Sequence, residues 1–291
     1  MKKVLIFGGY GFIGNNLFNE LKQKYIVKRY TSFKNQKKNR IKYNYKNFFE
    51  IIKNFKPDVV FFLSGTSNPD YSNKKYLIDL KKTNLILQSL LYALKNFKFK
   101  GKMFFFSSIG VYGSSSKKKV NEENILNPES FYTLSKLIAE KQCDFFRNHF
   151  NLNINILRIC SIFGPNLRRQ IIYKIIKKVN EKNKIIKLLG NINDKRELLF
   201  IEDLIIIIKK LMLSNVKKQT LNIGSNKQFF IKDIVNKVLK ISKKNKKVYF
   251  LNKIKTPKLG LLNNKKLHKY IKFKKNFNLD LGLKKTFLYY K

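Results

Sequence analysis

The sequence contains few cysteines and no long apolar run, and each shortage excludes a class of protein. Its two cysteines, Cys143 and Cys160, form no C-x-x-C pair and have no cluster of histidines nearby. We therefore expect neither a disulfide framework nor a metal site. No apolar stretch approaches the ~20 residues that span a bilayer, and glycines interrupt the one near the N-terminus. We therefore expect no signal peptide, no membrane insertion and a cytoplasmic location.

Acidic residues are scarce as well, since 17 Asp and Glu stand against 63 Lys and Arg and give a formal net charge of +46. Such a charge suggests a polyanion partner. However, only seven of the basic residues are Arg, and the lysines are spread along a chain that is also rich in Asn, Ile, Phe and Tyr. Proteins that read phosphates and bases rely instead on Arg forks and clustered patches. We therefore expect no specific nucleic-acid partner, although the charge would attract anionic small substrates.

Glycines at a fixed spacing follow the first apolar run. The run of residues 4–7 predicts a strand buried on both faces, and the apolar residues from position 12 onward recur at helical spacing. In a strand-turn-helix unit of this kind, glycines let a pyrophosphate approach the backbone at the helix N-terminus. The spacing here is G-x-x-G-x-x-G, whereas ordinary dehydrogenases have G-x-G-x-x-G. We predict that this unit binds a dinucleotide through Gly8, Gly11, Phe12, Ile13 and Gly14.

The second predicted strand, residues 25–30, lacks the acid that an NAD-binding fold places about 20 residues beyond its glycines to hold the ribose 2′-hydroxyl. The only acids from residue 15 to residue 57 are at positions 20 and 50, both in predicted helices. Arg29, Ser32 and Lys34 could instead hold a 2′-phosphate. The predicted cofactor is therefore NAD(P), and the missing acid favours NADP.

Strands and helices continue to alternate, with predicted helices at 47–55 and 78–94 and predicted strands at 59–63 and 102–106. Such βαβ units require right-handed crossovers and a parallel sheet. The strand at 59–63 leads into Leu63, Ser64 and Gly65. Small residues at the carboxyl end of a strand suit a backbone that passes close to a cofactor, so we assign these three residues to cofactor binding.

Hydroxyl groups follow the strand at 102–106, which runs into Ser107 and Ser108. One crossover later a helix begins near Tyr132, with Lys136 on the same face. Tyr-x-x-x-Lys occurs six times in the sequence, against about three expected by chance, so position rather than pattern singles out Tyr132. A phenol with a pKa near 10 can shuttle protons at neutral pH only if a cation stabilises the phenolate, and Lys136 can be that cation. Ser108 can hold the reacting oxygen beside the phenol.

Together these motifs resemble the extended short-chain dehydrogenase/reductase family, in particular its NAD-dependent epimerase/dehydratase branch. The resemblance rests on the glycines, on Ser108 followed by Val-Tyr-Gly, and on Tyr132 with Lys136. It continues into R-x-x-S-x-x-G-P at 158–165, where the family has R-x-x-N-x-x-G-P, and into residues 196–204, which resemble its R-D-F-x-x-V-D-D segment.

The resemblance implies an enzyme that acts on a nucleotide-activated sugar. Tyr132 would be the general acid/base, Lys136 would bind the nicotinamide ribose and lower the pKa of the tyrosine, and Ser108 would orient the substrate oxygen. The substrate would also contact Ser161 and an arginine pair for the diphosphate, Arg196 with Arg168 or Arg169. The family's sugar dehydratases carry T-D-E where this chain has Ser-Ile-Gly at 108–110, so we expect a 4-ketoreductase or a 4-epimerase instead.

The expected fold is α/β, a Rossmann-type doubly wound parallel sheet with a smaller C-terminal α/β substrate-binding region. Residues 1–165 would form the NAD(P)-binding domain, to which 201–224 return, and residues 166–200 and 225–291 would bind substrate. Family members are often homodimers, so a homodimer is a further expectation. Two alternatives remain open from the sequence, a non-catalytic NAD(P)-binding regulatory protein of this fold and a Lys-rich nucleic-acid-binding protein.

Overall fold

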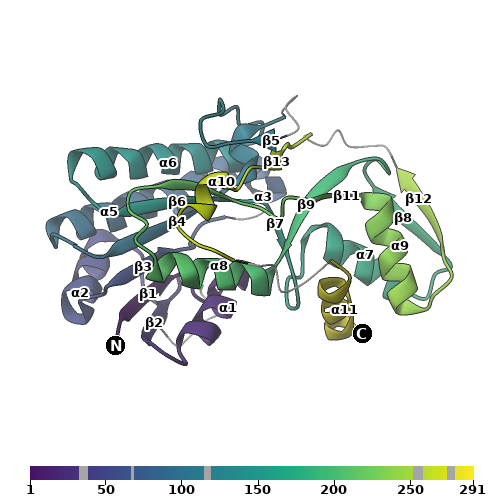
Figure 1. Ribbon diagram of the computed structural model, residues 1–291, viewed down its shortest axis with the longest axis horizontal. Helices are drawn as coiled ribbons and strands as arrows, with labels where there is room; N and C mark the ends of the chain where they lie inside the picture. The colour runs from purple at the N-terminus through teal and green to yellow at the C-terminus, as the bar shows by residue number, and fades with distance from the viewer. Residues whose placement is uncertain (33–38, 67–68, 115–118, 252–257, 274–278) are drawn as a thin grey trace.

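The computed structural model of the protein describes residues 1–32, 39–66, 69–114, 119–251, 258–273 and 279–291, with the backbone alone for 69–71. Its larger lobe is built on a six-stranded sheet in which every pair of neighbouring strands is parallel (Figure 1). The strand order is β10-β6-β4-β3-β1-β2. The bounds of these strands are β1 Lys3–Phe7, β2 Ile26–Tyr30, β3 Val59–Phe62, β4 Lys102–Ser108, β6 Ile154–Ile159 and β10 Thr220–Ile223.

Helices cover both faces of this sheet, which is why its inner strands are apolar without alternation. On one face, Val4 and Ile6 of β1 share a core with α1 (Phe12–Leu21) and α8 (Ile201–Leu213). On the other face, the alternate β1 side chains share a core with α2 (Tyr45–Phe55), α5 (Ile86–Asn96) and α6 (Phe131–His149). The predicted doubly wound parallel fold is therefore confirmed.

The order of the strands changes direction at β1, which pairs with β2 on one side and with β3 on the other. In open α/β sheets, ligands bind outside the carboxyl ends of the strands at such a switch point. Beyond β2 the structure records one isolated bridge, between Thr31 and Arg40. The glycines after β1 and Leu63 after β3 therefore lie at the position where this fold binds its ligand.

The helix predicted over 78–94 is helical throughout but contains a π turn. It consists of α4 (Tyr76–Leu80), a π-helical turn η1 (Lys81–Leu85) and α5, and it follows the short α3 (Pro69–Lys74). A π turn inserts an extra residue and is frequent at functional sites. Here the turn buries two polar side chains that bond within the fold, since Thr83 donates to Asp79 and Asn84 donates to Ser135 of α6. Thr83 therefore bonds within the helix, whereas Asn84 ties the π turn to α6.

The smaller lobe contains two sheets, β11-β9-β7 and β12-β8, with three helices packed on them. Its elements are β7 Ser161–Phe163, α7 Gln170–Asn180, β8 Ile185–Leu189, β9 Lys195–Phe200, β11 Gln228–Phe230, α9 Ile231–Ser242, β12 Lys247–Leu251 and α11 Leu279–Tyr290. Between β12 and α11 the chain returns to the larger lobe through β13 (Leu261–Leu262), which pairs with β5 (Lys119–Val120), and α10 (Lys265–His268). The chain therefore crosses between the two lobes several times.

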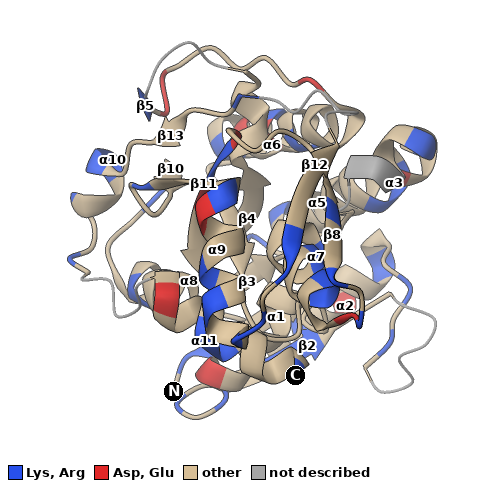
Figure 2. Ribbon diagram, turned by 90° about the vertical axis from the view of Figure 1, so that its right-hand side faces the viewer, with Lys and Arg blue, Asp and Glu red and all other residues tan. Residues whose placement is uncertain are grey.

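Basic residues are distributed over the structure as over the sequence. Figure 2 shows Lys and Arg on helices and strands of both lobes, with few acidic residues among them. Within the described residues, no helix is long and apolar enough to cross a membrane. The same part of the chain contains no group of three potential metal-ligating side chains.

Candidate active site

The glycine loop after β1 is shaped by close contacts that only glycine permits. Gly8 has φ +84°, and a Cβ there would lie 2.8 Å from the backbone nitrogen of Ser64. A Cβ on Gly14 would lie 2.4 Å from the carbonyl oxygen of Gly8, so helix α1 packs directly on the loop. Gly11, by contrast, has only one atom within 4 Å of such a Cβ, at 3.3 Å. The loop therefore leaves open space above Gly11.

The N-terminus of α1 faces that space. No side chain caps the helix at Gly11, and its first turn contains no acidic residue. Uncapped N–H groups and the helix dipole favour an anion at this end. Phe12 and Ile13 form the first turn, where the sequence predicted contact with a pyrophosphate, and the structure is therefore compatible with a dinucleotide at the loop.

Arg29 at the end of β2 is held against the glycine loop. Its guanidinium lies 4.0 Å from the ring centroid of Tyr10 and 3.9 Å from that of Phe18. It donates hydrogen bonds to Asn15 (2.7 Å) and to the carbonyl oxygen of Gly9 (3.3 Å). A positive charge is therefore fixed beside the loop. Ser32 is exposed just beyond β2, and Lys34 lies outside the described residues.

The residues after β3 connect the glycine loop to the π turn. Leu63 donates its backbone N–H to Phe7 at 2.9 Å, which continues the pairing of β3 with β1. Gly65 has φ +121°, and a Cβ there would lie 2.7 Å from the hydroxyl of Thr83. The backbone N–H of Thr66 donates to the same hydroxyl at 3.3 Å. Of the predicted cofactor residues, Gly65 therefore lies directly against the π turn, whereas Leu63 and Ser64 lie against Gly8.

Ser108, Tyr132 and Lys136, which we call the triad, meet where β4 ends against the first turn of α6. Ser130 and Thr133 form a capping box that fixes the start of α6. The hydroxyl of Ser108 accepts the backbone N–H of Gly110 at 3.1 Å and is close enough to the phenol of Tyr132 to lower its pKa. The ammonium of Lys136 lies 5.9 Å from the ring centroid of Tyr132 and donates to the carbonyl oxygen of Phe106 at 3.0 Å.

Burial and nearby charged groups shift the pKa values of Tyr132 and Lys136 in opposite directions. Burial raises the pKa of Tyr132, whereas the nearby hydroxyl of Ser108 and the positive charge of Arg169 lower it. Burial lowers the pKa of Lys136 to about 8, against the opposing effects of Asp79 and Glu140. In this structure, then, Arg169 is the cation that lowers the pKa of the phenol.

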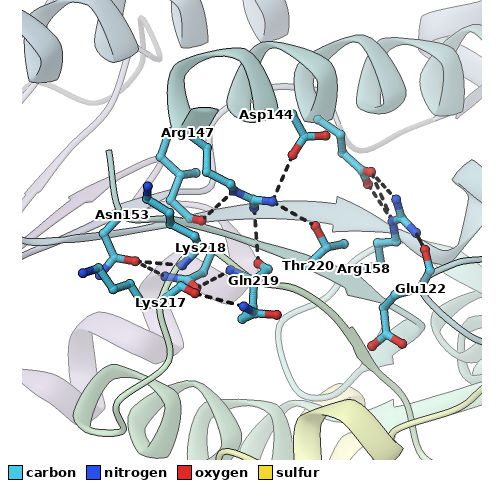
Figure 3. A network of polar contacts seen from close by, with 12 residues as sticks. Glu122, Asp144, Arg147, Asn153, Arg158, Lys217, Lys218, Gln219 and Thr220 are labelled. Carbon is cyan, nitrogen blue, oxygen red and sulfur yellow. Dashed lines mark hydrogen bonds and ion pairs between the residues drawn. The ribbon is translucent and has the colours of Figure 1, made fainter. Parts of the chain in front are cut away.

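A buried ion pair supports the triad from below. Glu140, one turn beyond Lys136 on α6, accepts two hydrogen bonds from the Nε and one at 2.8 Å from the Nη2 of Arg158. Ser107 donates a further, short hydrogen bond to the same carboxylate. Arg158 also donates to the hydroxyl of Tyr112 and to the carbonyl oxygen of Glu122, which Figure 3 shows beside Arg158. These bonds tie α6 to β4 and β6 directly behind Lys136.

A second arginine fixes the other end of α6. Arg147 donates to the carboxylate of Asp144 and reaches across to Gln219 and Thr220 at the start of β10 (Figure 3). Because β10 is the last strand of the sheet, this contact anchors α6 at the edge far from the glycine loop.

The predicted substrate residues lie on the smaller lobe. Ser161 begins β7 and is paired with Leu198 of β9. Arg196, also on β9, lies 3.8 Å from the carboxylate of Asp194. The positive charge of Arg168 lowers the pKa of Tyr290 on α11, whereas the charge of the adjacent Arg169 lowers the pKa of Tyr132. Of the two adjacent arginines, Arg169 is therefore the one beside the triad.

The sequence did not indicate Asp79 or Asn84, because both lie in a stretch that reads as an ordinary helix. In the structure both are buried, and each has one side-chain oxygen for which the described residues provide no hydrogen-bond partner. The signal that could have found them is a pair of polar residues, Asp79 and Thr83, one turn apart on the buried face of a helix.

The other Tyr-x-x-x-Lys matches do not reproduce this arrangement within the described residues. Tyr173 lies on α7 and packs against Tyr290. For the matches at 30, 249 and 270 the lysine lies outside the described part of the chain, as does the side chain of Tyr71.

Comparison with known proteins points to one family of enzymes. Residues 4–224 match the model of the NAD dependent epimerase/dehydratase family. The chain is 30% identical over 279 residues to dTDP-D-glucose 4,6-dehydratase of Dictyostelium discoideum, covering 83% of this chain but only 62% of that protein. It is 27% identical over 265 residues to dTDP-4-dehydro-6-deoxyglucose reductase of Escherichia coli, covering 83% and 82% of the two chains.

Among solved structures, UDP-glucuronic acid 4-epimerase from Bacillus cereus, in complex with UDP-glucuronic acid and NAD, superposes with a TM-score of 0.89. It is 25% identical to this chain, and the match covers 99% of this chain and 98% of that one.

Proposed function

Because the chain belongs to the NAD dependent epimerase/dehydratase family, we propose that it transfers a hydride at a carbinol or keto carbon of a nucleotide-activated sugar, as a 4-ketoreductase or a 4-epimerase. The resemblance seen in the sequence is thereby confirmed. The Dictyostelium relative is named as a dehydratase, but this chain has Ser108, Ile109 and Gly110 where dehydratases have the acid pair. A reductase or an epimerase therefore remains the better proposal.

In this proposal Tyr132 moves the proton. When the sugar carbinol is oxidised, the phenolate accepts the proton of its hydroxyl, and in the opposite direction the phenol donates a proton to the keto oxygen. Ser108, whose hydroxyl lowers the pKa of the nearby phenol, orients the sugar oxygen beside it. Lys136 holds the nicotinamide ribose, and the open space at Gly11 and the uncapped start of α1 receive the pyrophosphate. NAD(P), when bound there, supplies the carbon that carries the hydride.

The placement of Ser108 and Tyr132, where β4 ends against the first turn of α6, is the observation that carries this proposal, because it joins a strand end at the ligand edge to a proton-transfer group. Replacing Tyr132 by Phe keeps the ring and removes the proton donor. Turnover should fall by about 10²- to 10⁴-fold, with cofactor binding retained. Tyr173→Phe, at a matched Tyr-x-x-x-Lys on α7, is the control and should leave turnover unchanged.

Nucleotide sugars and their 4-keto forms provide the substrate panel for that assay. A reductase should consume added NADPH in proportion to product, whereas an epimerase should interconvert two sugars without net consumption. Wild-type turnover in Tyr132→Phe would refute the assignment of the site, and a folded protein that binds the cofactor but turns over nothing in the panel would favour the non-catalytic alternative.

We also propose that the chain prefers NADP. Arg29 is fixed beside the glycine loop by two aromatic rings, and none of the residues 25–32 is acidic. A hydrogen bond between charged groups contributes about 1.5–3 kcal/mol, so Arg29→Met should raise the KM for NADPH about tenfold or more and leave that for NADH little changed. Lys28→Met is the control, because Lys28 faces Phe55 on the other side of β2. Equal effects on both cofactors would contradict a 2′-phosphate site.

We propose that residues 1–165 and 201–224 bind the cofactor and that residues 166–200 and 225–291 bind the sugar nucleotide.

We further propose a homodimer formed through α5 and α6. These helices expose Tyr92, Phe145 and Phe150, which are 48%, 51% and 40% accessible. Aromatic side chains grouped on one helical face are typical of protein interfaces. The cytoplasmic location stays a prediction.

A further inference from the structure

Gly110 lies two residues beyond Ser108, in a 3₁₀ turn, η2 (Ile109–Tyr112), that directly follows β4. Its φ is not positive, so the backbone does not require glycine at this position. A Cβ there would lie 2.4 Å from Cγ2, the methyl carbon of Thr133. Carbon atoms in contact are normally about 3.5–4.0 Å apart. The space beside Gly110 is therefore already filled by the methyl group of Thr133.

The methyl group of Thr133 is held in place because the hydroxyl on the same Cβ is bonded to Ser130. This hydroxyl donates to the carbonyl oxygen of Ser130 at 2.9 Å and accepts its backbone N–H at 3.1 Å. It also lies 3.0 Å from the hydroxyl of Ser130, which accepts the backbone N–H of Thr133 at 3.2 Å. Rotation about χ1 would move the methyl and the hydroxyl together, so turning the methyl away from Gly110 would break these bonds.

Thr133 thus contacts both sides of the proposed proton-transfer site. On α6 it belongs to the capping box that fixes the first turn, in which Tyr132 is the preceding residue. On the side of β4 its methyl group packs on Gly110, whose backbone N–H donates to the hydroxyl of Ser108 at 3.1 Å. Since that hydroxyl accepts the N–H, its own proton is free to point toward the phenol or a sugar oxygen. One side chain therefore provides a common reference for both hydroxyl groups.

We propose that Thr133 is a positioning residue of the active site, whose methyl group, packed on Gly110, sets the separation between the hydroxyl of Ser108 and the phenol of Tyr132. The inference rests on the proposed function for its catalytic meaning, whereas the packing is a property of the protein alone. A Cβ at position 110 would push η2 away from α6, and the hydroxyl of Ser108 would move with the N–H that holds it. A displacement of a reacting group by about 1 Å can cost about 10²-fold in rate.

The test moves one methyl group across this contact. Gly110→Ala adds a methyl that collides with Thr133, whereas Thr133→Ser removes the methyl at 133 and keeps the hydroxyl of the capping box. In the double variant the new Cβ would lie 3.6 Å from the Cβ of residue 133, an ordinary contact distance. On an accepted sugar of the panel, kcat should fall about 10- to 100-fold in Gly110→Ala and by a smaller factor in Thr133→Ser. Because the double variant conserves volume, it should return to within about threefold of wild type.

A second measurement needs neither cofactor nor substrate. In protein labelled with ¹³C at tyrosine Cζ, Tyr132→Phe identifies the signal of Tyr132 by removing it, and Ser108→Ala shows where that signal lies without the neighbouring hydroxyl. Gly110→Ala should move the signal toward its position in Ser108→Ala, and the double variant should move it back. Ile52→Val removes a buried methyl group from α2 and is the control for a general loss of stability. It should leave the signal and kcat unchanged.

The outcomes separate this inference from the proposed function. A wild-type signal in folded Gly110→Ala, or a double variant no closer to wild type than Gly110→Ala, would overturn the role of Thr133. If Gly110→Ala does not fold, a folded double variant with the wild-type signal is the expected rescue, and a double variant that also fails to fold would overturn the proposal. If the signals behave as expected but the wild-type protein turns over no nucleotide sugar, only the proposed function fails.

Discussion

Replacing Lys136 by Met should stabilise the protein at neutral pH and destabilise it at high pH. The side chain is 7% exposed, and its pKa falls from 10.5 to about 8. Below pH 8 both the folded and the unfolded chain hold the proton, so the folded state carries the full cost of the buried ammonium. Between about 8 and 10.5 only the unfolded chain holds it, and stability therefore rises with pH across this window.

The size of the effect follows from the same shift. A difference of 2.5 pKa units, from 10.5 to 8, corresponds to about 3 kcal/mol of unfolding free energy. Met has a similar volume but leaves the carbonyl of Phe106, now bonded at 3.0 Å, without its donor, which costs about 1 kcal/mol. The variant should therefore gain about 2 kcal/mol at pH 7 and lose about 1 kcal/mol once Lys136 is neutral in both states.

Urea unfolding followed by circular dichroism at pH 7 and near pH 10.5 measures both values, because the chain has no tryptophan to report by fluorescence. The other lysines titrate in both proteins, so the difference between them isolates Lys136. A variant that is less stable than wild type at pH 7, or one whose gain is the same at both pH values, would refute the reasoning.

Two further predictions concern the surroundings of the site. Arg158→Leu should cost about 3–5 kcal/mol of unfolding free energy in a urea titration, because it leaves the carboxylate of Glu140, 2% exposed, buried without its partner. A loss below about 1 kcal/mol would mean that the ion pair is not desolvated. Phe145→Glu should convert the proposed dimer to a monomer in light scattering, whereas Leu213→Glu on α8, equally exposed, should not. An unchanged mass for Phe145→Glu would contradict an interface on α5 and α6.

The sequence predicted those features that depend on local pattern. The buried strand before Gly8, the helix after Gly11 and the alternation of strands and helices all follow from apolar periodicity and glycine spacing. The closeness of Ser108 and Tyr132 followed from topology, because the carboxyl ends of parallel strands meet at one edge of the sheet.

What the sequence could not predict depends on contacts between distant elements. The helix expected over 78–94 contains a π turn in which Asn84 bonds to Ser135 of α6, a contact between elements far apart in the sequence. The choice between Arg168 and Arg169 depends on the backbone before α7, where Arg169 is extended (φ −159°, ψ −178°) and adjacent side chains point to opposite sides. The return of the chain through β13 and α10 rests on pairing with β5, two residues long, which leaves no periodic signal.

The several passages of the chain between the lobes restrict how the molecule can move. Glu197 of β9 accepts backbone N–H groups from Asn226, which precedes β11, and from Leu262 of β13, each at 2.9 Å. One carboxylate thus ties together three connecting segments that are far apart in the sequence. Because the lobes are joined in this way, any movement of one lobe relative to the other would have to bend several connections at once. Domain closure here should consist of small, concerted adjustments rather than a swing of one lobe, and a cut in one connection would leave the lobes held together.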